Sequence, residues 1–252
     1  MRKNLINLTA VAFAIVSITG CEKGNEYKIN HGAAELKDCA ITQIIRNQFS
    51  TIDTLVFTYN SWGDPERIDK LPIPKTGSPN YVFKYDKKKR LTDIMGLYHD
   101  LTSGEIWHKY FYDNPGNGNI TRDSAYIFFQ TQNGALVNYM YRSLTYYTYD
   151  KYDRILKDST IHSASPIPIV NTYTYDASGN RAGRLYDNKI NMLRTNKIWM
   201  FYSRDYSVNN PFAADAYNAN GLPTQLDLFS KGTLLKFMGE DYYGAQITYD
   251  CR

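Results

Sequence analysis

The side chains that could ligate a metal are few and lie far apart in this chain of 252 residues. The four histidines are His31, His99, His108 and His162. None of them has a second histidine or a cysteine at the spacing of a zinc site. The segment that begins at Asp113 fits part of a calcium-binding loop, but Pro115 stands where a ligand oxygen is required. We therefore expect no metal and no other cofactor.

Nucleophilic and acid–base catalysis have equally little support. The chain has no Gly-x-Ser-x-Gly motif, and Ser163 beside His162 is adjacency in sequence without the arrangement of a triad. Paired carboxylates could hydrolyse a glycosidic bond, but the acidic residues recur where turns begin, and turn chemistry accounts for them there. The residues favour a protein that is not an enzyme, and a glycan-active hydrolase is the least favoured function.

The most regular feature is a short pattern in which tyrosine precedes Asp or Asn. An aromatic residue stands two positions before this tyrosine in five copies: Phe57–Asn60, Phe83–Asp86, Tyr110–Asp113, Tyr147–Asp150 and Tyr173–Asp176. Weaker copies end at Asn218 and Asp250. Successive tyrosines are 26 to 42 residues apart. Such internal similarity indicates a repeated supersecondary unit.

Each copy reads as a β-hairpin. Leu55, Phe57 and Tyr59 alternate with other residues at the period of a strand that buries one face. The Asp or Asn side chain can accept hydrogen bonds from backbone amides of the turn. A basic and an apolar residue, such as Arg154 and Ile155, then begin the next strand. The repeats predict an all-β domain, a single curled antiparallel β-meander or barrel-like sheet of about twelve to fourteen strands.

The first residues predict an exported protein. Arg2 and Lys3 precede a mostly apolar stretch, Leu5–Ile18, which is too short to cross a bilayer as a helix. This order is typical of a signal peptide, here residues 1–20. The residues before Cys21 resemble a bacterial lipobox, and the resemblance implies that this cysteine is lipidated and anchors the protein to the cell envelope.

Residues 21–38 are polar and read as a flexible tether between the lipid and a domain over residues 39–252. The acidic and lysine-containing stretch directly after Cys21 resembles the surface-export signal of Bacteroidetes-type lipoproteins. That resemblance implies an outer-membrane lipoprotein exposed at the cell surface, and the periplasmic face of the membrane is the alternative.

Two further cysteines, Cys39 and Cys251, stand at the two ends of the predicted domain. A disulfide between them would tie the first strand to the last in an oxidising envelope. Two separate buried thiols are the alternative, because the sequence does not show that their Cα atoms come close together.

The three tryptophans differ in their predicted surroundings. Trp107 and Trp199 lie in aromatic segments that read as strands, so we expect both in the core. Trp62 falls in the first hairpin turn, where a large ring is hard to bury. Trp62 is therefore the candidate for contact with a ligand, through stacking on a sugar or packing against a protein.

The charge of the chain argues against nucleic acid as a partner. The formal net charge is +4, of which Arg2 and Lys3 contribute two units, and no basic run interleaves with aromatic residues. The compositional bias is aromatic instead, with 23 tyrosines.

The tyrosine–aspartate turn followed by arginine and an apolar residue resembles the YD repeats of RHS-type proteins. The stretches "CAITQI" (Cys39–Ile44) and "LVFTYNSWGDPERI" (Leu55–Ile68) resemble Bacteroidetes-type envelope lipoproteins of unknown function that have a porin-like fold. The resemblance implies a curled sheet and carries no catalytic residue. We expect a non-enzymatic binding or scaffold module for a glycan or an envelope protein; the alternative is a barrel-type carrier of a small apolar ligand.

Overall fold

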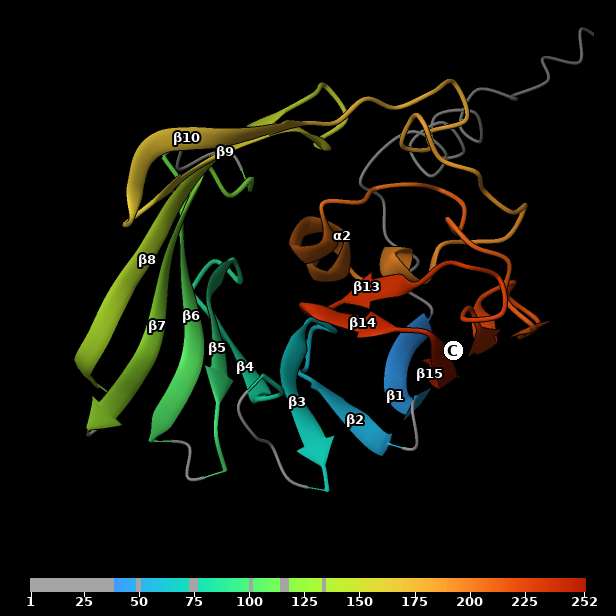
Figure 1. Cartoon of the computed structure of the whole chain (residues 1–252), viewed down its shortest axis with the longest axis horizontal. Helices are drawn as coiled ribbons and strands as arrows, with labels where there is room; N and C mark the ends of the chain where they lie inside the picture. The colour runs from blue at the N-terminus through green and yellow to red at the C-terminus, as the bar shows by residue number, and fades with distance from the viewer. Residues whose placement is uncertain (1–38, 49–50, 73–76, 100–101, 114–117, 133–134) are drawn as a thin grey trace, which may run out of the picture.

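The fold is an antiparallel sheet of 13 strands that curves around a short helix (Figure 1). The computed structural model describes residues 39–48, 51–72, 77–99, 102–113, 118–132 and 135–252. Ten strands follow one another in chain order: β1 (Cys39–Gln48), β2 (Thr51–Tyr59), β3 (Pro65–Leu71), β4 (Asn80–Tyr85), β5 (Leu91–Leu97), β6 (Ser103–Phe111), β7 (Arg122–Gln132), β8 (Ala135–Tyr149), β9 (Ile155–His162) and β10 (Ser165–Thr172). The predicted antiparallel meander is confirmed over these strands.

The chain then returns to the other side of β1. There β15 (Gly244–Cys251) pairs with β1, followed by β12 (Pro223–Asp227) and β11 (Ala216–Tyr217). Among the described residues β10 and β11 form separate edges, so the sheet is open rather than a closed barrel. The 3₁₀-helix η1 (Met192–Thr195), the helix α2 (Lys197–Ser203) and the strands β13 (Leu235–Phe237) and β14 (Glu240–Tyr242) lie inside the curve (Figure 1).

Five hairpin turns share one geometry, which explains the recurring Asp or Asn. They begin at Asn60, Asp86, Asp150, Asp176 and Asn218. In each turn the side-chain Oδ1 accepts hydrogen bonds from the backbone N–H groups two and four residues later, such as those of Tyr152 and Arg154 in the turn at Asp150. The prediction that these residues open turns is confirmed.

The residue three positions after the Asp or Asn has a positive φ in every one of these turns. Gly63, Gly179 and Gly221 fill this position in three of them, and Lys89 and Asp153 adopt φ of 61° and 62° in the other two. Glycine is favoured there because the left-handed region costs it little.

The tyrosine before the turn ties neighbouring hairpins together. The hydroxyls of Tyr59, Tyr85, Tyr112, Tyr149 and Tyr249 donate to the backbone carbonyls of Ile41, Pro65, Leu91, Ile120 and Pro223, at 2.5 to 2.8 Å. Each ring packs against the core while its hydroxyl satisfies a carbonyl of the adjacent unit. Because the position requires both an apolar ring and a hydroxyl donor, it is tyrosine and not phenylalanine.

The fifth copy of the pattern departs from the prediction. Strand β10 ends at Thr172, so Tyr173 and Tyr175 lie beyond it, and Tyr175 keeps only an isolated bridge to Arg181. The third copy runs through Asp113 into residues 114–117, which lie outside the described residues.

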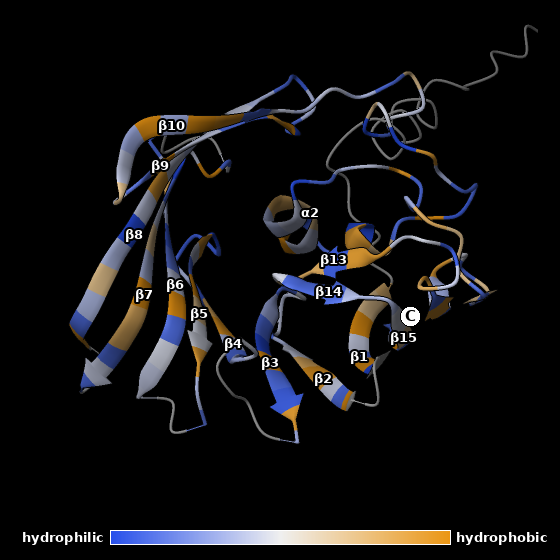
Figure 2. Cartoon of the chain, in the orientation of Figure 1, coloured by the Kyte–Doolittle hydropathy of each residue, from blue (hydrophilic) through white to orange (hydrophobic). Residues whose placement is uncertain are grey.

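The core lies between the inner face of the sheet and α2. Trp199 is fully buried and packs edge-on against Phe57 and Phe83 of the sheet, at ring-centroid distances of 5.8 and 5.7 Å. Phe237 of β13 covers it from the other side at 5.3 Å. Figure 2 shows hydrophobic residues on α2, β13 and the neighbouring strands.

The prediction of a strand around Trp199 was wrong, although its burial was expected. The segment "KIWMFYS" forms α2, with the Asn196 side chain capping its N-terminus by accepting from the Ile198 N–H at 2.9 Å. Four consecutive residues of the helix are buried: Ile198, Trp199, Met200 and Phe201. A helix surrounded by core on all sides lacks the polar stripe that marks helical periodicity.

Trp107 lies on the opposite, outer face of the sheet. It is partly buried there against a small second cluster of Met95, Leu97 and Phe129. Its Nε1 donates to Asp93 at 2.8 Å, and its ring lies 5.0 Å from that of Tyr126. Within the described part of the chain, no helix is long and apolar enough to span a membrane.

Candidate functional site

A cleft of about 880 Å³ lies at the end of the sheet where hairpin turns gather. Its walls come from the turns after β2 and β4, the start of α2, the first residues of β1 and the end of β15. Its aromatic lining consists of Tyr59, Trp62, Tyr112, Tyr149, Phe201 and Tyr206. The volume lies in the range of small-ligand sites, ~300–1,000 Å³.

The tyrosines present neutral ring surface to the cleft. The hydroxyls of Tyr59, Tyr112 and Tyr149 are already bonded to backbone carbonyls. Burial raises the pKa of all three phenols above the ordinary value, so none carries a charge at neutral pH. These groups are therefore suited to apolar or stacking contact and not to acid–base chemistry.

Trp62 lies at the cleft and is 45 % exposed. Its backbone N–H donates to Asn60 Oδ1 at 3.2 Å, which holds the residue in the turn. The indole packs edge-on against Tyr85 at 6.0 Å, and Lys89 Nζ lies 5.2 Å from its ring centroid. The exposure expected of Trp62 from its place in the turn is therefore present, and its contact with a ligand stays a prediction.

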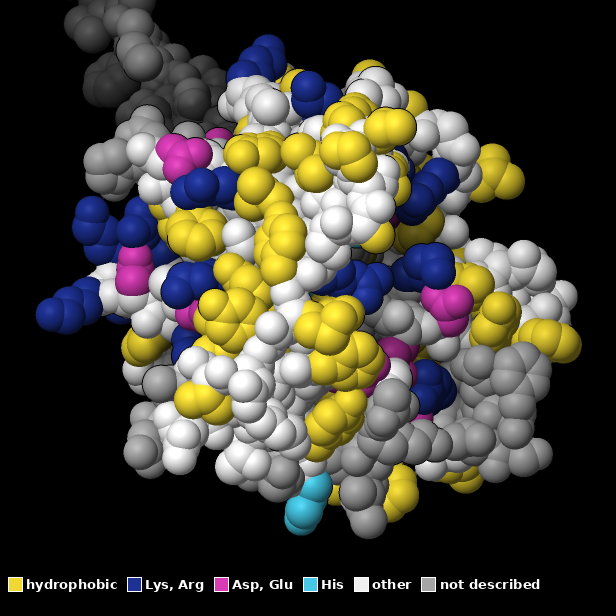
Figure 3. All heavy atoms as spheres, turned by 60° about the vertical axis from the view of Figure 1, so that its left-hand side comes forward, with side chains coloured by type: hydrophobic (Ala, Val, Ile, Leu, Met, Phe, Trp, Pro, Cys, Tyr) yellow, Lys and Arg dark blue, Asp and Glu magenta, His cyan; other side chains and the backbone are white. Residues whose placement is uncertain are grey.

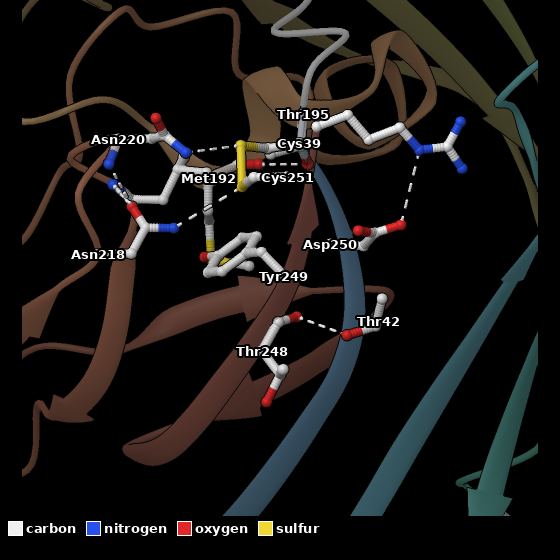
Figure 4. Close-up of a disulfide and its surroundings, with 12 residues drawn as sticks. Cys39, Thr42, Met192, Thr195, Asn218, Asn220, Thr248, Tyr249, Asp250 and Cys251 are labelled. Carbon is white, nitrogen blue, oxygen red and sulfur yellow. Dashed lines mark hydrogen bonds and ion pairs between the residues drawn. A yellow bond between two sulfur atoms is a disulfide. The ribbon is translucent and has the colours of Figure 1, made fainter.

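A disulfide joins Cys39 to Cys251 beside the cleft (Figure 4). The two residues are opposite one another in the β1–β15 pair, and their Cα atoms are 4.0 Å apart. The side chains of Asn218 and Asn220 donate to the two sulfurs, at 4.0 Å to Cys251 and 3.3 Å to Cys39. Of the two alternatives that the sequence left open, the structure has the bridge between the first and last strands.

The cleft holds more cationic than anionic side chains. Three of its cations lie near carboxylates: Arg90 Nη2 is 2.7 Å from Asp86, Lys197 Nζ is 3.7 Å from Asp64 and Arg252 Nε is 3.8 Å from Asp250. Burial alone would raise the pKa of Asp86, but hydrogen bonds from Arg90 and Lys88 lower it.

Two cations of the cleft, Lys88 and Lys89, have no carboxylate partner within the part of the chain that the structure describes. The remaining acid of the lining, Asp153, accepts a hydrogen bond from Asn119 Nδ2 at 2.7 Å. Among the described residues Asp153 is thus not paired with a cation either, and the positive charge next to Trp62 is that of Lys89, whose Nζ lies 5.2 Å from the ring centroid.

The other residues considered from the sequence are scattered. Cys21 and His31 lie outside the described residues, as do the signal peptide 1–20 and the tether 21–38. His99 follows β5, and His162 ends β9. Among the described residues, no group of three or more His, Cys, Asp or Glu side chains could hold a metal ion.

A polar network that the sequence did not reveal lies on the inner face of β6–β9. The Asp123 carboxylate is buried, 2.8 Å from His108 Nδ1, and accepts a hydrogen bond from the Tyr147 hydroxyl at 3.4 Å. Arg204 Nη2 donates to the same hydroxyl at 2.5 Å. The ring of Tyr202 from α2 packs edge-on against His108 at 5.8 Å, which links the network to the helix.

The network continues to β9. Arg204 Nε lies 3.8 Å from the buried Asp158 carboxylate, which accepts hydrogen bonds from the Tyr173 hydroxyl at 2.5 Å and Asn171 Nδ2 at 2.8 Å. Cations and hydroxyl groups thus surround the two carboxylates, and these hydrogen bonds add to the packing of Tyr110 and Tyr147 against Phe201 on the same face. The only sequence signal is an aspartate at an inward position of each of two strands.

A second buried cluster ties the sheet to β14. Glu240 accepts from Lys70 Nζ at 2.8 Å and from Ser78 Oγ at 3.1 Å, and it also pairs with Arg46 at 2.5 Å. Asp53 pairs with Arg46 and lies 3.4 Å from Lys70. Two cations therefore balance two anions between the sheet and β14. Only the folded chain brings them together, because Glu240 is 170 residues from Lys70.

Comparison of the sequence with protein-family models and with curated proteins finds no significant match.

Proposed function

We propose that this protein is a lipid-anchored cell-envelope protein that binds a glycan in the cleft, without chemical conversion of the ligand. The observation that carries the proposal is the half-open indole of Trp62 at a cleft of about 880 Å³ whose walls are tyrosine rings. Sugar rings present flat C–H faces to aromatic side chains, and such contacts pair apolar area with a polar periphery. A groove of tyrosine and tryptophan favours a glycan over a small apolar cargo.

The carrier alternative receives less support from the interior. A carrier barrel encloses its ligand in the centre, whereas Trp199, Phe201 and Phe237 fill the space inside this curved sheet. The hydrolase alternative requires two carboxylates poised across the groove. Here Asp64 and Asp250 each lie near a cation, and Asp153 accepts from Asn119.

The anchor is part of the same proposal. Cleavage before Cys21 and lipidation of its thiol would leave residues 21–38 as a tether that joins the domain at Cys39, a residue of the cleft lining. We also propose that the hairpins are YD-type repeats of the RHS kind. Their shared turn geometry and the tyrosine bonds between neighbouring units support that assignment.

A glycan array probed with the full chain tests the binding proposal. We expect a defined set of glycans to bind the parent protein and Trp62→Ala to weaken that binding by about tenfold, which corresponds to ~1.4 kcal/mol. Tyr139→Ala is the matched control, because Tyr139 is an aromatic residue of β8 that is 54 % exposed and lies outside the cleft lining. An array without bound glycans, or equal binding by Trp62→Ala and the parent, would contradict the proposal.

A further inference from the structure

We infer that the glycan bound in this cleft is anionic, with a carboxylate, phosphate or sulfate group held by Lys88 and Lys89. The inference rests on the proposed function, since it names the class of glycan that the same cleft takes. It comes from the balance of charge around Trp62 and not from the stacking surface itself.

The charges of the cleft divide into compensated and uncompensated groups. Arg90, Lys197 and Arg252 each lie within 4 Å of a carboxylate. Lys88 and Lys89 have no such neighbour among the described residues, and both side chains are exposed. Two ammonium groups of one cleft without a carboxylate beside them favour an anion in that cleft.

The turn fixes these lysines in relation to Trp62. Asp86 Oδ1 accepts from the backbone N–H groups of Lys88 and Arg90 at 2.8 and 3.0 Å, and Lys89 adopts φ of 61°. The ammonium group of Lys89 consequently lies 5.2 Å from the centroid of the Trp62 ring. A sugar stacked on the open part of that ring has its ring substituents within reach of Lys89.

The arrangement discriminates against neutral glycans only through these two charges. The hydroxyls of Tyr59, Tyr112 and Tyr149 are engaged with backbone carbonyls and offer little selectivity. Exposed ion pairs contribute roughly 0.2–1 kcal/mol each. Two of them together therefore predict a preference of about tenfold for the charged form of a glycan over its neutral form.

The test compares a galacturonic acid oligomer with its fully methyl-esterified form, in which each carboxylate has become a neutral methyl ester, by isothermal titration calorimetry with the full chain. A sulfated and an unsulfated dextran extend the comparison to a second anionic group. We expect the acid forms to bind about tenfold more tightly at low salt, and the difference to shrink at ~0.5 M salt because exposed charges are screened.

Substitution of the lysines makes the test specific. Lys88→Gln together with Lys89→Gln is expected to remove the preference for the acid form while the neutral form still binds. Lys84→Gln together with Lys157→Gln is the matched control, since these exposed lysines lie outside the cleft and the net charge changes equally. Inorganic phosphate should compete only weakly, because it lacks a ring to stack on Trp62.

The outcomes separate this inference from the proposed function. Equal affinity for acid and neutral oligomers, with Trp62→Ala still weakening both, overturns the anionic preference and leaves glycan binding in place. Loss of the preference in the Lys84 and Lys157 control also overturns it, because a general charge effect would then suffice. Complete displacement of the acid oligomer by inorganic phosphate would show that the lysines bind any anion, and it would overturn the inference of an anionic glycan. Failure of every oligomer to bind would overturn both proposals.

Discussion

The two halves of the sheet are stabilised in different ways. In the near half, β15 and β1–β5, the inner face is covered by α2 and the β13–β14 hairpin, and residues such as Ile41, Ile44 and Ile68 are fully buried. In the far half, β6–β10, Phe201 of α2 packs against Tyr110 and Tyr147, but the buried side chains include the charged Asp123 and Asp158. At its edge, Ile167 of β10 is 75 % exposed. Figure 3, in which the far half comes forward, shows hydrophobic side chains spread over this surface among lysines and arginines.

The difference shows how the far half of the sheet is stabilised with less apolar packing than the near half. On its inner face the far half has the network of Asp123, Asp158 and Arg204, and on its outer face it has aromatic pairs such as Trp107 with Tyr126. Hydrogen-bonded networks and cross-strand aromatic pairs each contribute modestly, whereas apolar burial grows with area. We therefore expect the near half to carry most of the stability of the domain.

Strand β10 forms a free edge of the sheet, and its prolines protect it from pairing with another chain. The N–H of Tyr173 donates to Leu156 of β9, so alternate residues before it also direct their N–H groups to β9. The register of the β9–β10 pair shifts between Ser165 and Ile169, and Pro166 and Pro168 stand in this stretch and have no N–H to offer. Proline on an edge strand blocks pairing with another chain.

The largest expected effect is the loss of the near-half core. Trp199→Ala removes the side chain that contacts Phe57, Phe83 and Phe237, and we expect it to lower the free energy of unfolding by about 4 kcal/mol. Trp107→Ala in the far half should lower the free energy of unfolding clearly less, because Trp107 is only partly buried. Urea denaturation of both variants measures the difference, and equal losses would contradict the comparison.

Removal of the disulfide comes next. Replacing Cys39 and Cys251 by serine removes the covalent link between β1 and β15, which closes a loop of 212 residues. We expect the free energy of unfolding to fall by about 3 kcal/mol. Hydrogen exchange should show the loss of protection centred on β1 and β15. Exchange that increases first in β8–β10 would show that the bridge does not act on the near half.

Breaking the far-half network should have an intermediate effect. Arg204→Met removes the positive charge near the buried Asp158 and Asp123 carboxylates, and we expect the free energy of unfolding to fall by about 2 kcal/mol. The effect is smaller than for a fully buried ion pair, because the Arg204 side chain is 23 % exposed. Adding Asp158→Asn should recover part of this loss in a double-mutant cycle. A single mutant as stable as the parent would show that the network is not needed.

Alkaline pH offers a milder test of the same region. Burial and the hydrogen bond to Asp158 raise the pKa of Tyr173 to about 12, and burial raises the pKa of Tyr202 to about 12 despite Arg204. An unfolded tyrosine ionises near pH ~10, so the unfolded chain loses protons first. Stability should be intact below pH ~10 and fall progressively up to about pH 12. Tyrosinate absorbance and circular dichroism recorded together would show whether ionisation and unfolding coincide, and Tyr173→Phe should weaken the dependence.

The smallest expected effect is at the free edge. Ile167→Thr on β10 should change stability by no more than about 0.5 kcal/mol, because its side chain is already in water. The same substitution at the fully buried Ile44 should cost several times more. A large loss from the β10 variant would show that the far edge is part of the cooperative core.

Much of this architecture was predictable because its causes are local. Alternation around Phe57 and Phe83 defines which face is buried, and the Asp or Asn of each turn bonds amides only two and four residues away. The helix α2 was not predictable from its period, since every side of its middle is buried. The far-half network was missed because His108, Asp123 and Arg204 come from separate segments, and no spacing connects them.

The sequence predicted one residue of the candidate site, Trp62, but it did not predict the cleft. Trp62 stands out in the sequence because it occupies a turn, but Tyr85 and Lys89, which contact its ring, come from the next hairpin. Their proximity depends on the pairing of strands, which stacks equivalent turns at one end of the sheet.

The sequence by itself determined the hairpin unit, its turns and the inward face of its strands, because these follow from contacts between residues close in the chain. Only the tertiary structure decided that Cys39 meets Cys251, that α2 fills the curve and that the sheet stays open at β10. These outcomes depend on contacts across many residues, where the free energy of packing and of charge pairing selects one arrangement among several that local preferences allow.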